Sequence, residues 1–156
     1  MKKIYKLSSI LIVLLLVNCG YTPIYSVKSI NFKIERIEFT GDKNLKYKLQ
    51  NKLKKYKKIK NSKNTLTLEI NSKKKITTQS KNSKGEALFY LMEIKINITS
   101  TNQNNIIKEN NFIESFTYNN KTDKFDLTQY EKNIEENLID SIINKIVIDL
   151  STKYQW

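Results

Sequence analysis

The sequence contains no histidine and a single cysteine, Cys19. The missing histidine excludes His-activated Ser or Cys nucleophiles, and it also excludes a zinc site built from Cys and His. The only glycines, Gly20, Gly41 and Gly85, lie too far apart to form a phosphate-binding loop, so the Walker and dinucleotide motifs are excluded as well. We therefore expect a protein that is not an enzyme and that binds no cofactor and no metal.

Arginine is also scarce, because Arg36 is the only one among 28 Lys+Arg residues. Arginine is the side chain best suited to bidentate contacts with bases and phosphates, so its scarcity argues against a nucleic-acid-binding protein. The formal net charge is nevertheless +13. This excess indicates either an anionic partner or the codon bias of an AT-rich genome, and the sequence leaves both explanations open.

The amino-terminal residues have the pattern of an export signal. Lys2, Lys3 and Lys6 precede an apolar run over residues 7–17. A membrane-spanning helix needs about 20 apolar residues, so this short run is typical of a signal peptide, and a permanent span is the alternative. Cleavage by the ordinary signal peptidase does not fit, because the small residues it prefers are missing before residue 19.

A different cleavage does fit, because Leu16-Val17-Asn18-Cys19 resembles the bacterial lipobox. Asn18 departs from the small residue that usually precedes the cysteine. The resemblance implies a lipoprotein signal peptide at residues 1–18 and acylation of Cys19; the alternative is a free thiol in a discarded signal. Two or more acyl chains anchor a protein stably to a membrane.

Residues 19–29 are expected to form a tether that begins at the acylated cysteine, because Pro23 disfavours a helix there. Gly20 stands where an Asp would retain a lipoprotein at the inner membrane, so we expect the outer membrane as destination. Residues 30–156 form one domain, since a length of 156 residues with 39% hydrophobic residues is typical of a single globular core.

The first part of this domain is expected to be a strand followed by a helix. Apolar residues alternate over residues 30–39 and change phase at Glu35-Arg36, which predicts a bulged strand or two short strands. We expect a turn at residues 40–43. A lysine-rich amphipathic helix is then predicted by apolar residues at helical spacing: Leu45, Leu49, Leu53 and Tyr56.

Three more strands follow. Alternation from Leu66 to Ile70 predicts a strand that continues to a turn near residues 83–85. Every even-numbered residue from Leu88 to Ile98 is apolar, which predicts a long central strand. A hairpin at residues 101–105 then leads into a fourth strand at residues 106–118.

A long helix closes the domain. Thr128 to Glu131 match the capping box of a helix start. The apolar stripe of this helix recurs every four residues: Tyr130, Ile134, Leu138, Ile142, Ile146 and Leu150. Glu135-Glu136 are assigned to its solvent side and are not expected to be catalytic. The order β-α-β-β-β-α predicts an α+β fold, with two helices packed on one face of a mostly antiparallel four-stranded sheet.

The start of the predicted mature chain carries a resemblance to a known family. Cys19-Gly20-Tyr21-Thr22-Pro23-Ile24-Tyr25 resembles the Cys-Gly-aromatic-x-Pro-hydrophobic-Tyr start of the lipopolysaccharide-assembly lipoproteins of the LptE family, notably their alphaproteobacterial members. That family has two helices on a four-stranded sheet, in the order expected here. The resemblance implies a lipid-anchored, periplasm-facing outer-membrane protein that plugs the lumen of the LptD-type β-barrel and assists lipopolysaccharide assembly.

The implied partners suggest contacts within the domain. Lipid A carries phosphates, so lysines near one end of the sheet are candidates to bind it, although they alternatively only solvate an exposed hairpin. These candidate lipopolysaccharide contacts are Lys73, Lys74, Lys75, Lys81 and Lys84. For the barrel interface, the candidates are Phe116, Tyr118 and the loop at residues 119–126. The alternative function is that of an accessory envelope lipoprotein in a lipid-transport or secretion complex, without lipopolysaccharide binding.

Overall fold

The computed structural model describes residues 30–154 except residue 61. The signal peptide, the acylated Cys19 and the tether predicted from the sequence lie outside the described residues. Within the described residues, no helix is long and apolar enough to cross a membrane.

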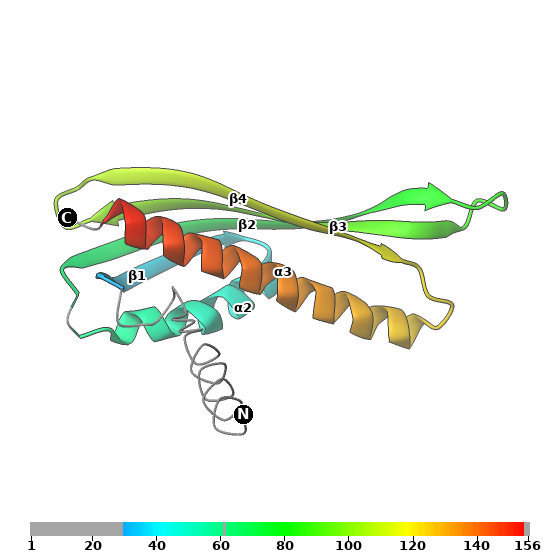
Figure 1. The fold of residues 1–156 in the computed structure, drawn as a ribbon, viewed down its shortest axis with the longest axis horizontal. Coiled ribbons are helices and arrows are strands. Elements are labelled where there is room, and N and C mark those ends of the chain that lie inside the picture. Colours follow the sequence, from blue (N-terminus) through cyan, green and yellow to red (C-terminus); the bar gives the residue numbers. More distant parts are fainter. Residues whose placement is uncertain (1–29, 61, 155–156) are drawn as a thin grey trace, which may run out of the picture. The chain divides into compact units, whose positions relative to one another are not determined.

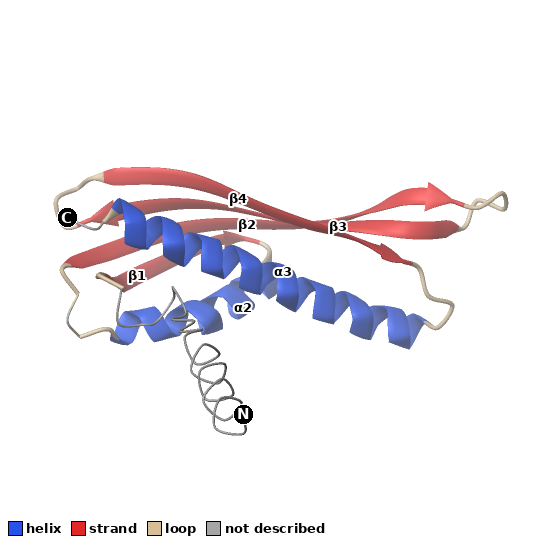
Figure 2. Ribbon diagram, in the orientation of Figure 1, coloured by secondary structure: helices blue, strands red, loops and turns tan. Residues whose placement is uncertain are grey.

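The domain is a two-layer α+β structure, as the sequence predicts (Figure 1). In chain order the elements are β1 (Phe32–Gly41), α2 (Lys43–Leu53), a 3-10 helix (Lys54–Lys58), β2 (Asn64–Lys81), β3 (Ala87–Asn102), β4 (Ile107–Asn119) and α3 (Lys124–Lys153). The sheet order is β1-β2-β3-β4, with β1 parallel to β2 and the other pairs antiparallel. Both helices cover the same face of the sheet (Figure 2). The predicted fold class is therefore confirmed.

The predicted bulge in the first strand is present. Ile34 pairs with Leu66 and Arg36 pairs with Thr67, so Glu35 is an extra residue without a partner on β2. A bulge of this kind reverses which face the following side chains occupy. It explains why the apolar residues of β1 change phase in the sequence.

The first strand ends within residues 40–43 as expected, but the connection is shorter than a four-residue turn, because β1 runs to Gly41 and α2 begins at Lys43. Gly41 has φ of 90°, and a Cβ at this position would lie 2.1 Å from the backbone oxygen of Ser72. Only glycine fits so close an approach. Asp42 then caps α2, because its carboxylate accepts hydrogen bonds from the backbone N–H groups of Asn44 and Leu45, at 2.9 and 3.1 Å.

The core lies between the sheet and the two helices. Leu45, Leu49 and Leu53 of α2 are fully buried, and Tyr56 stacks on Phe32 with ring centroids 6.1 Å apart, as the helical spacing predicts. Burying one such leucine stabilises the fold by about 1.5–3 kcal/mol. The even-numbered residues Met92, Ile94, Ile96 and Ile98 line the same core from β3. The predicted apolar stripe of α3 completes this core with Ile134, Leu138, Ile142, Ile146 and Leu150.

The start of α3 differs from the expectation. The helix begins at Lys124, because Asp123 is its N-cap and accepts a hydrogen bond from the backbone N–H of Asp126 at 3.0 Å. The hydroxyl of Thr128 instead donates to the backbone oxygen of Lys124 at 2.8 Å, inside the helix. The capping box predicted at Thr128 is therefore wrong, and the helix is one turn longer than expected.

Candidate functional site

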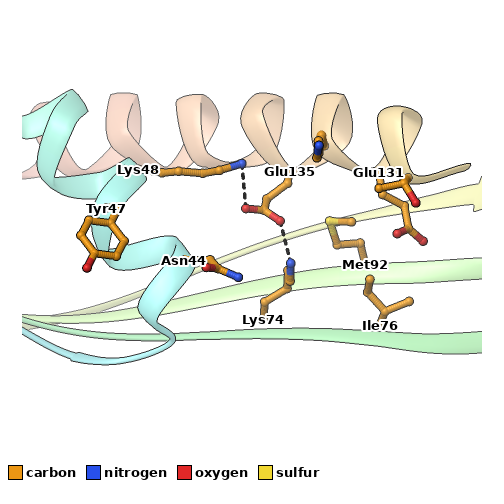
Figure 3. Close-up of a pocket in the computed structure, with 10 residues that line it drawn as sticks. Asn44, Tyr47, Lys48, Lys74, Ile76, Met92, Glu131 and Glu135 are labelled. Atoms are coloured by element: carbon orange, nitrogen blue, oxygen red, sulfur yellow. Dashed lines mark hydrogen bonds and ion pairs between the residues drawn. The ribbon is translucent and has the colours of Figure 1, made fainter. Parts of the chain in front are cut away.

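The most distinctive cluster of charged side chains lies beside the first turns of α2, next to the half of the sheet that α2 does not cover. There α2, α3, β2 and β3 line a groove of about 440 Å³ (Figure 3). Its lining residues are Asn44, Tyr47, Lys48, Lys74, Ile76, Met92, Thr128, Glu131, Lys132 and Glu135. The groove forms because α2 is much shorter than α3, so one helix alone covers the sheet beyond Lys74.

A buried carboxylate holds the three elements together at one end of this groove. Glu135 of α3 is only 6% exposed. One of its oxygens lies 2.9 Å from the ammonium of Lys48 on α2, and the other lies 2.7 Å from the ammonium of Lys74 on β2. Figure 3 shows the carboxylate between the two lysines. Buried charges are tolerated when they are paired in this way.

Further ion pairs continue this network between the two helices. Lys48 also lies 2.8 Å from Glu136, and Lys52 lies 3.3 Å from Glu136 and 2.6 Å from Asp140. Burial acts to lower the pKa of Lys48, but hydrogen bonds to Glu136 and Glu135 outweigh it and raise the pKa above 10.5. The hydrogen bond to Asp140 raises the pKa of Lys52, and the hydrogen bond from Lys48 lowers the pKa of Glu136.

The assignment of Glu135 to the solvent side of the helix is therefore wrong. Glu135 precedes Ile139 by four residues and Ile142 by seven, so it lies on the buried stripe of α3. The spacing of the apolar residues contains this signal, although a carboxylate at such a position is normally read as exposed. Both oxygens of Glu135 are occupied by lysines, so the arrangement can fix the helices on the sheet, and two cations share the single negative charge of this carboxylate. Among the described residues, no group of acidic and cysteine side chains is suited to hold a metal ion.

The five lysines predicted to contact lipopolysaccharide do not form one cluster. Lys74 lies on the helix-covered face and pairs with Glu135. Lys73 and Lys75 alternate with it and are exposed on the opposite face. Lys81 ends β2, and Lys84 lies in the turn that follows, where its backbone N–H donates to the side-chain oxygen of Asn82 at 3.0 Å. Only Lys81 and Lys84 share one end of the sheet.

A second hollow lies at this end, between the β2–β3 turn and the loop that leads into α3. It has a volume of about 530 Å³, and its lining includes Leu88, Tyr90, Lys121 and Lys124. No local pattern in the sequence connects Lys121 and Lys124 with the hairpin, because only the β3–β4 register brings them together. Asn120 marks this contact, since its backbone N–H donates to the backbone oxygen of Leu88 at 2.8 Å.

The two aromatic residues proposed for the barrel interface differ in their environment. Phe116 is 46% exposed and is available for such a contact. Tyr118 is only 2% exposed, and its hydroxyl donates to the carboxylate of Glu131 at 2.6 Å. Burial, followed by this hydrogen bond, raises the pKa of Tyr118. Tyr118 is therefore a core residue, and its assignment to an exposed interface is wrong.

Solved structures of bacterial lipoproteins are similar to this fold. Rare lipoprotein B from Shewanella oneidensis has a TM-score of 0.51 and 12% identity, over 73% of this chain and 95% of that chain. A minor lipoprotein from Acinetobacter baumannii has a TM-score of 0.56 and 13% identity, over 80% and 92%. Lipoprotein B from Nitrosomonas europaea has a TM-score of 0.54 and 9% identity, over 86% and 94%.

No family model matches the sequence, and no curated protein matches it. At identities of 9 to 13%, the likeness to the solved lipoproteins establishes the fold. It covers 92 to 95% of the three known chains, so the α+β domain described here corresponds to nearly the whole of each of them.

Proposed function

We propose that this chain is an outer-membrane lipoprotein of the LptE type, which occupies an LptD-type β-barrel and assists lipopolysaccharide assembly. The observation that carries the proposal is a conjunction of two independent features. The segment Cys19–Tyr25 resembles the acylated start of that family, and the domain that follows has a fold found in bacterial lipoproteins. A fold alone does not specify a function, so the motif supplies the functional part of the argument.

The face of the sheet that the helices leave uncovered supports a location inside a barrel. The middle of this face carries polar side chains from β2, β3 and β4, including Thr67, Asn71, Asn97, Thr99 and Asn111. Charged side chains such as Lys73 and Lys75 lie beside them, and the apolar Ile107 and Ile113 lie along β4. The lumen of a large outer-membrane barrel is polar. A largely polar sheet face fits such a wall, whereas an apolar face would suit burial in a protein core.

The far end of the β2–β3 hairpin supports contact with an anionic lipid. Leu88 and Phe89 are 44% and 41% exposed, and Phe89 pairs directly with Ser80 beside Lys81. Lys84 follows in the turn. Exposed apolar side chains next to ammonium groups match a ligand that has both acyl chains and phosphates. We therefore assign the lipopolysaccharide contact to Lys81 and Lys84, with Lys121 and Lys124 across the second hollow.

The proposal is tested by expressing the tagged full-length chain in a Gram-negative host and extracting it from separated membranes with mild detergent. The expected result is an outer-membrane location and a large β-barrel protein that co-purifies. A Cys19→Ala variant can be neither acylated nor cleaved at the lipobox, so it should keep its apolar signal, remain in the inner-membrane fraction and be lost from the outer membrane. Co-purification with an inner-membrane or secretin complex, and no barrel, would contradict the proposal and favour an accessory envelope lipoprotein.

A further inference from the structure

The outer edge of β4 is long and unprotected. β4 is the last strand of the sheet and pairs with β3 from Ile107 to Asn119 without any shift of register. Within residues 30–154, no strand pairs with its other side. An exposed edge strand presents a row of free N–H and C=O groups, which are a template for pairing with another strand.

Two hydrogen bonds show which backbone groups face outward. The hydroxyl of Ser100 on β3 donates to the backbone oxygen of Lys108 at 3.2 Å, and the backbone N–H of Asn120 donates to the oxygen of Leu88 at 2.8 Å. Even-numbered residues of this strand therefore direct their backbone groups toward β3. Because the register is unbroken, the odd-numbered residues, such as Ile113 and Ser115, direct theirs away from the sheet.

The opposite edge of the sheet is protected in the usual ways. β1 carries the bulge at Glu35, and beyond it Arg36 and Glu38 form an exposed ion pair at 2.9 Å. Bulges and charges are the devices by which proteins prevent strand addition. Lys108 of β4 does not protect its edge in this way, because its ammonium donates a hydrogen bond to the backbone oxygen of Lys153 on α3 at 2.6 Å and so points toward that helix. The two edges are thus treated differently within one domain.

Apolar side chains lie beside the free edge. Ile107 and Ile113 are 63% and 49% exposed on the uncovered face, and Phe116 is 46% exposed on the other. Glu109 stands between the two isoleucines on the same face. An added strand would place its own side chains next to them, and β-strand addition combines main-chain hydrogen bonds with such side-chain contacts.

We propose that the free edge of β4 binds an extended segment of the barrel protein as an additional strand of the sheet. The inference rests on the proposed function, which supplies that partner. The chemistry expected of the segment is alternating apolar side chains beside Ile107 and Ile113 and a basic side chain beside Glu109. A second copy of this chain fits less well, because lysine outnumbers the acidic residues in the predicted mature chain as well, and two copies with the same large positive charge repel each other.

The first test compares two substitutions at one outward-facing residue of the full-length chain. Ser115→Pro removes an N–H that points away from β3, whereas Ser115→Ala keeps it and serves as the matched control. We expect Ser115→Pro to lower the amount of co-purified barrel at least fivefold and Ser115→Ala to leave it unchanged. Ile113→Lys, which retains the backbone and adds a charge at the edge, should act like Ser115→Pro and decides the question if the proline variant fails to fold.

The second test is hydrogen exchange at single-residue resolution on the purified complex and on the free chain. The amides of Ile113 and Ser115 should exchange at least tenfold more slowly in the complex, while the exposed amides of β1 should change less. Equal barrel recovery for all three variants, or unprotected β4 amides in a complex that contains the barrel, would overturn strand addition while the proposed function stands. If no barrel co-purifies with the unsubstituted chain, both the proposed function and the strand addition are overturned. If a second copy of the chain causes the protection of the β4 amides, the choice of partner is overturned.

Discussion

The carboxylate of Glu135 on α3 lies 2.7 Å from the ammonium of Lys74 on β2, although 61 residues separate them in the sequence. The second oxygen of the same carboxylate lies 2.9 Å from Lys48 on α2. One buried acid thus connects both helices to the sheet. It also removes Lys74 from the set of lysines that are free to bind an external anion.

Replacing Glu135 with Gln should lower the free energy of unfolding by about 1–3 kcal/mol, because it leaves Lys48 and Lys74 close together without their shared counter-charge. The estimate is below that for a fully buried pair, since both lysine side chains are about a quarter exposed. Urea unfolding followed by circular dichroism measures it. Glu136→Gln is the matched control, because the Glu136 side chain is 43% exposed, and it should cost less than about 1 kcal/mol. Equal losses for the two variants would contradict the assigned role.

Because of the ion pairs between α2 and α3, the free energy of unfolding should be constant at intermediate pH and should fall at both acid and alkaline pH. The pKa of Glu136 is lowered in the folded state, so its contribution is complete above pH 4.5 and is lost as the pH falls through the folded-state pKa. The pKa of Lys48 is raised, so its contribution is complete below pH 10.5 and is lost as the pH rises through the folded-state pKa. Urea midpoints measured from pH 3 to pH 12 test this, and Glu136→Gln should flatten the acid side. An unchanged acid limb in that variant would show that other carboxylates cause the loss.

Two glycines with similar backbone angles should respond differently to alanine. Gly41 has φ of 90° and a Cβ there would meet the backbone oxygen of Ser72 at 2.1 Å, whereas Gly85 has φ of 84° and open space around it. Gly85→Ala should therefore cost only the backbone strain, about 1 kcal/mol, and Gly41→Ala should cost several-fold more or prevent folding. Thermal unfolding of both variants tests the difference. Similar melting temperatures would show that the junction between β1 and α2 relaxes easily.

Reversal of two lysines at the hairpin end should weaken lipopolysaccharide binding more than reversal of two lysines on the uncovered sheet face. One double variant carries Lys81→Glu and Lys84→Glu, and the other carries Lys73→Glu and Lys75→Glu. The two double variants therefore change the net charge by the same amount. The first pair lies beside the exposed Leu88 and Phe89, so its loss should be larger at every salt concentration. Binding of the full-length chains to lipopolysaccharide, followed by fluorescence anisotropy, measures this. Unchanged binding in both variants would contradict a role for these lysines.

The sequence predicts the fold well because periodicity records burial directly. The leucines at positions 45, 49 and 53 and the apolar residues of β3 are all in the core, and the phase change at Glu35-Arg36 marks a real bulge. The start of α3 was harder to predict, because Asp123 and Thr128 both resemble caps and only the backbone hydrogen bonds distinguish them.

The candidate site was predictable only in part, because its residues meet through tertiary structure. Lys73, Lys74 and Lys75 are consecutive, yet strand alternation places Lys74 on the face opposite its neighbours. Glu135 is charged but buried, since its two partners come from α2 and β2. No local pattern reveals such pairings. Tyr118 is similar, because its partner Glu131 lies on α3.

Native mass spectrometry of the complex purified from outer membranes tests the central claim most directly. It measures both the stoichiometry and the mass of the mature chain in one experiment. The account predicts one copy of a chain that begins at a triacylated Cys19, bound to one copy of a large β-barrel protein. An unacylated chain without a barrel would contradict it.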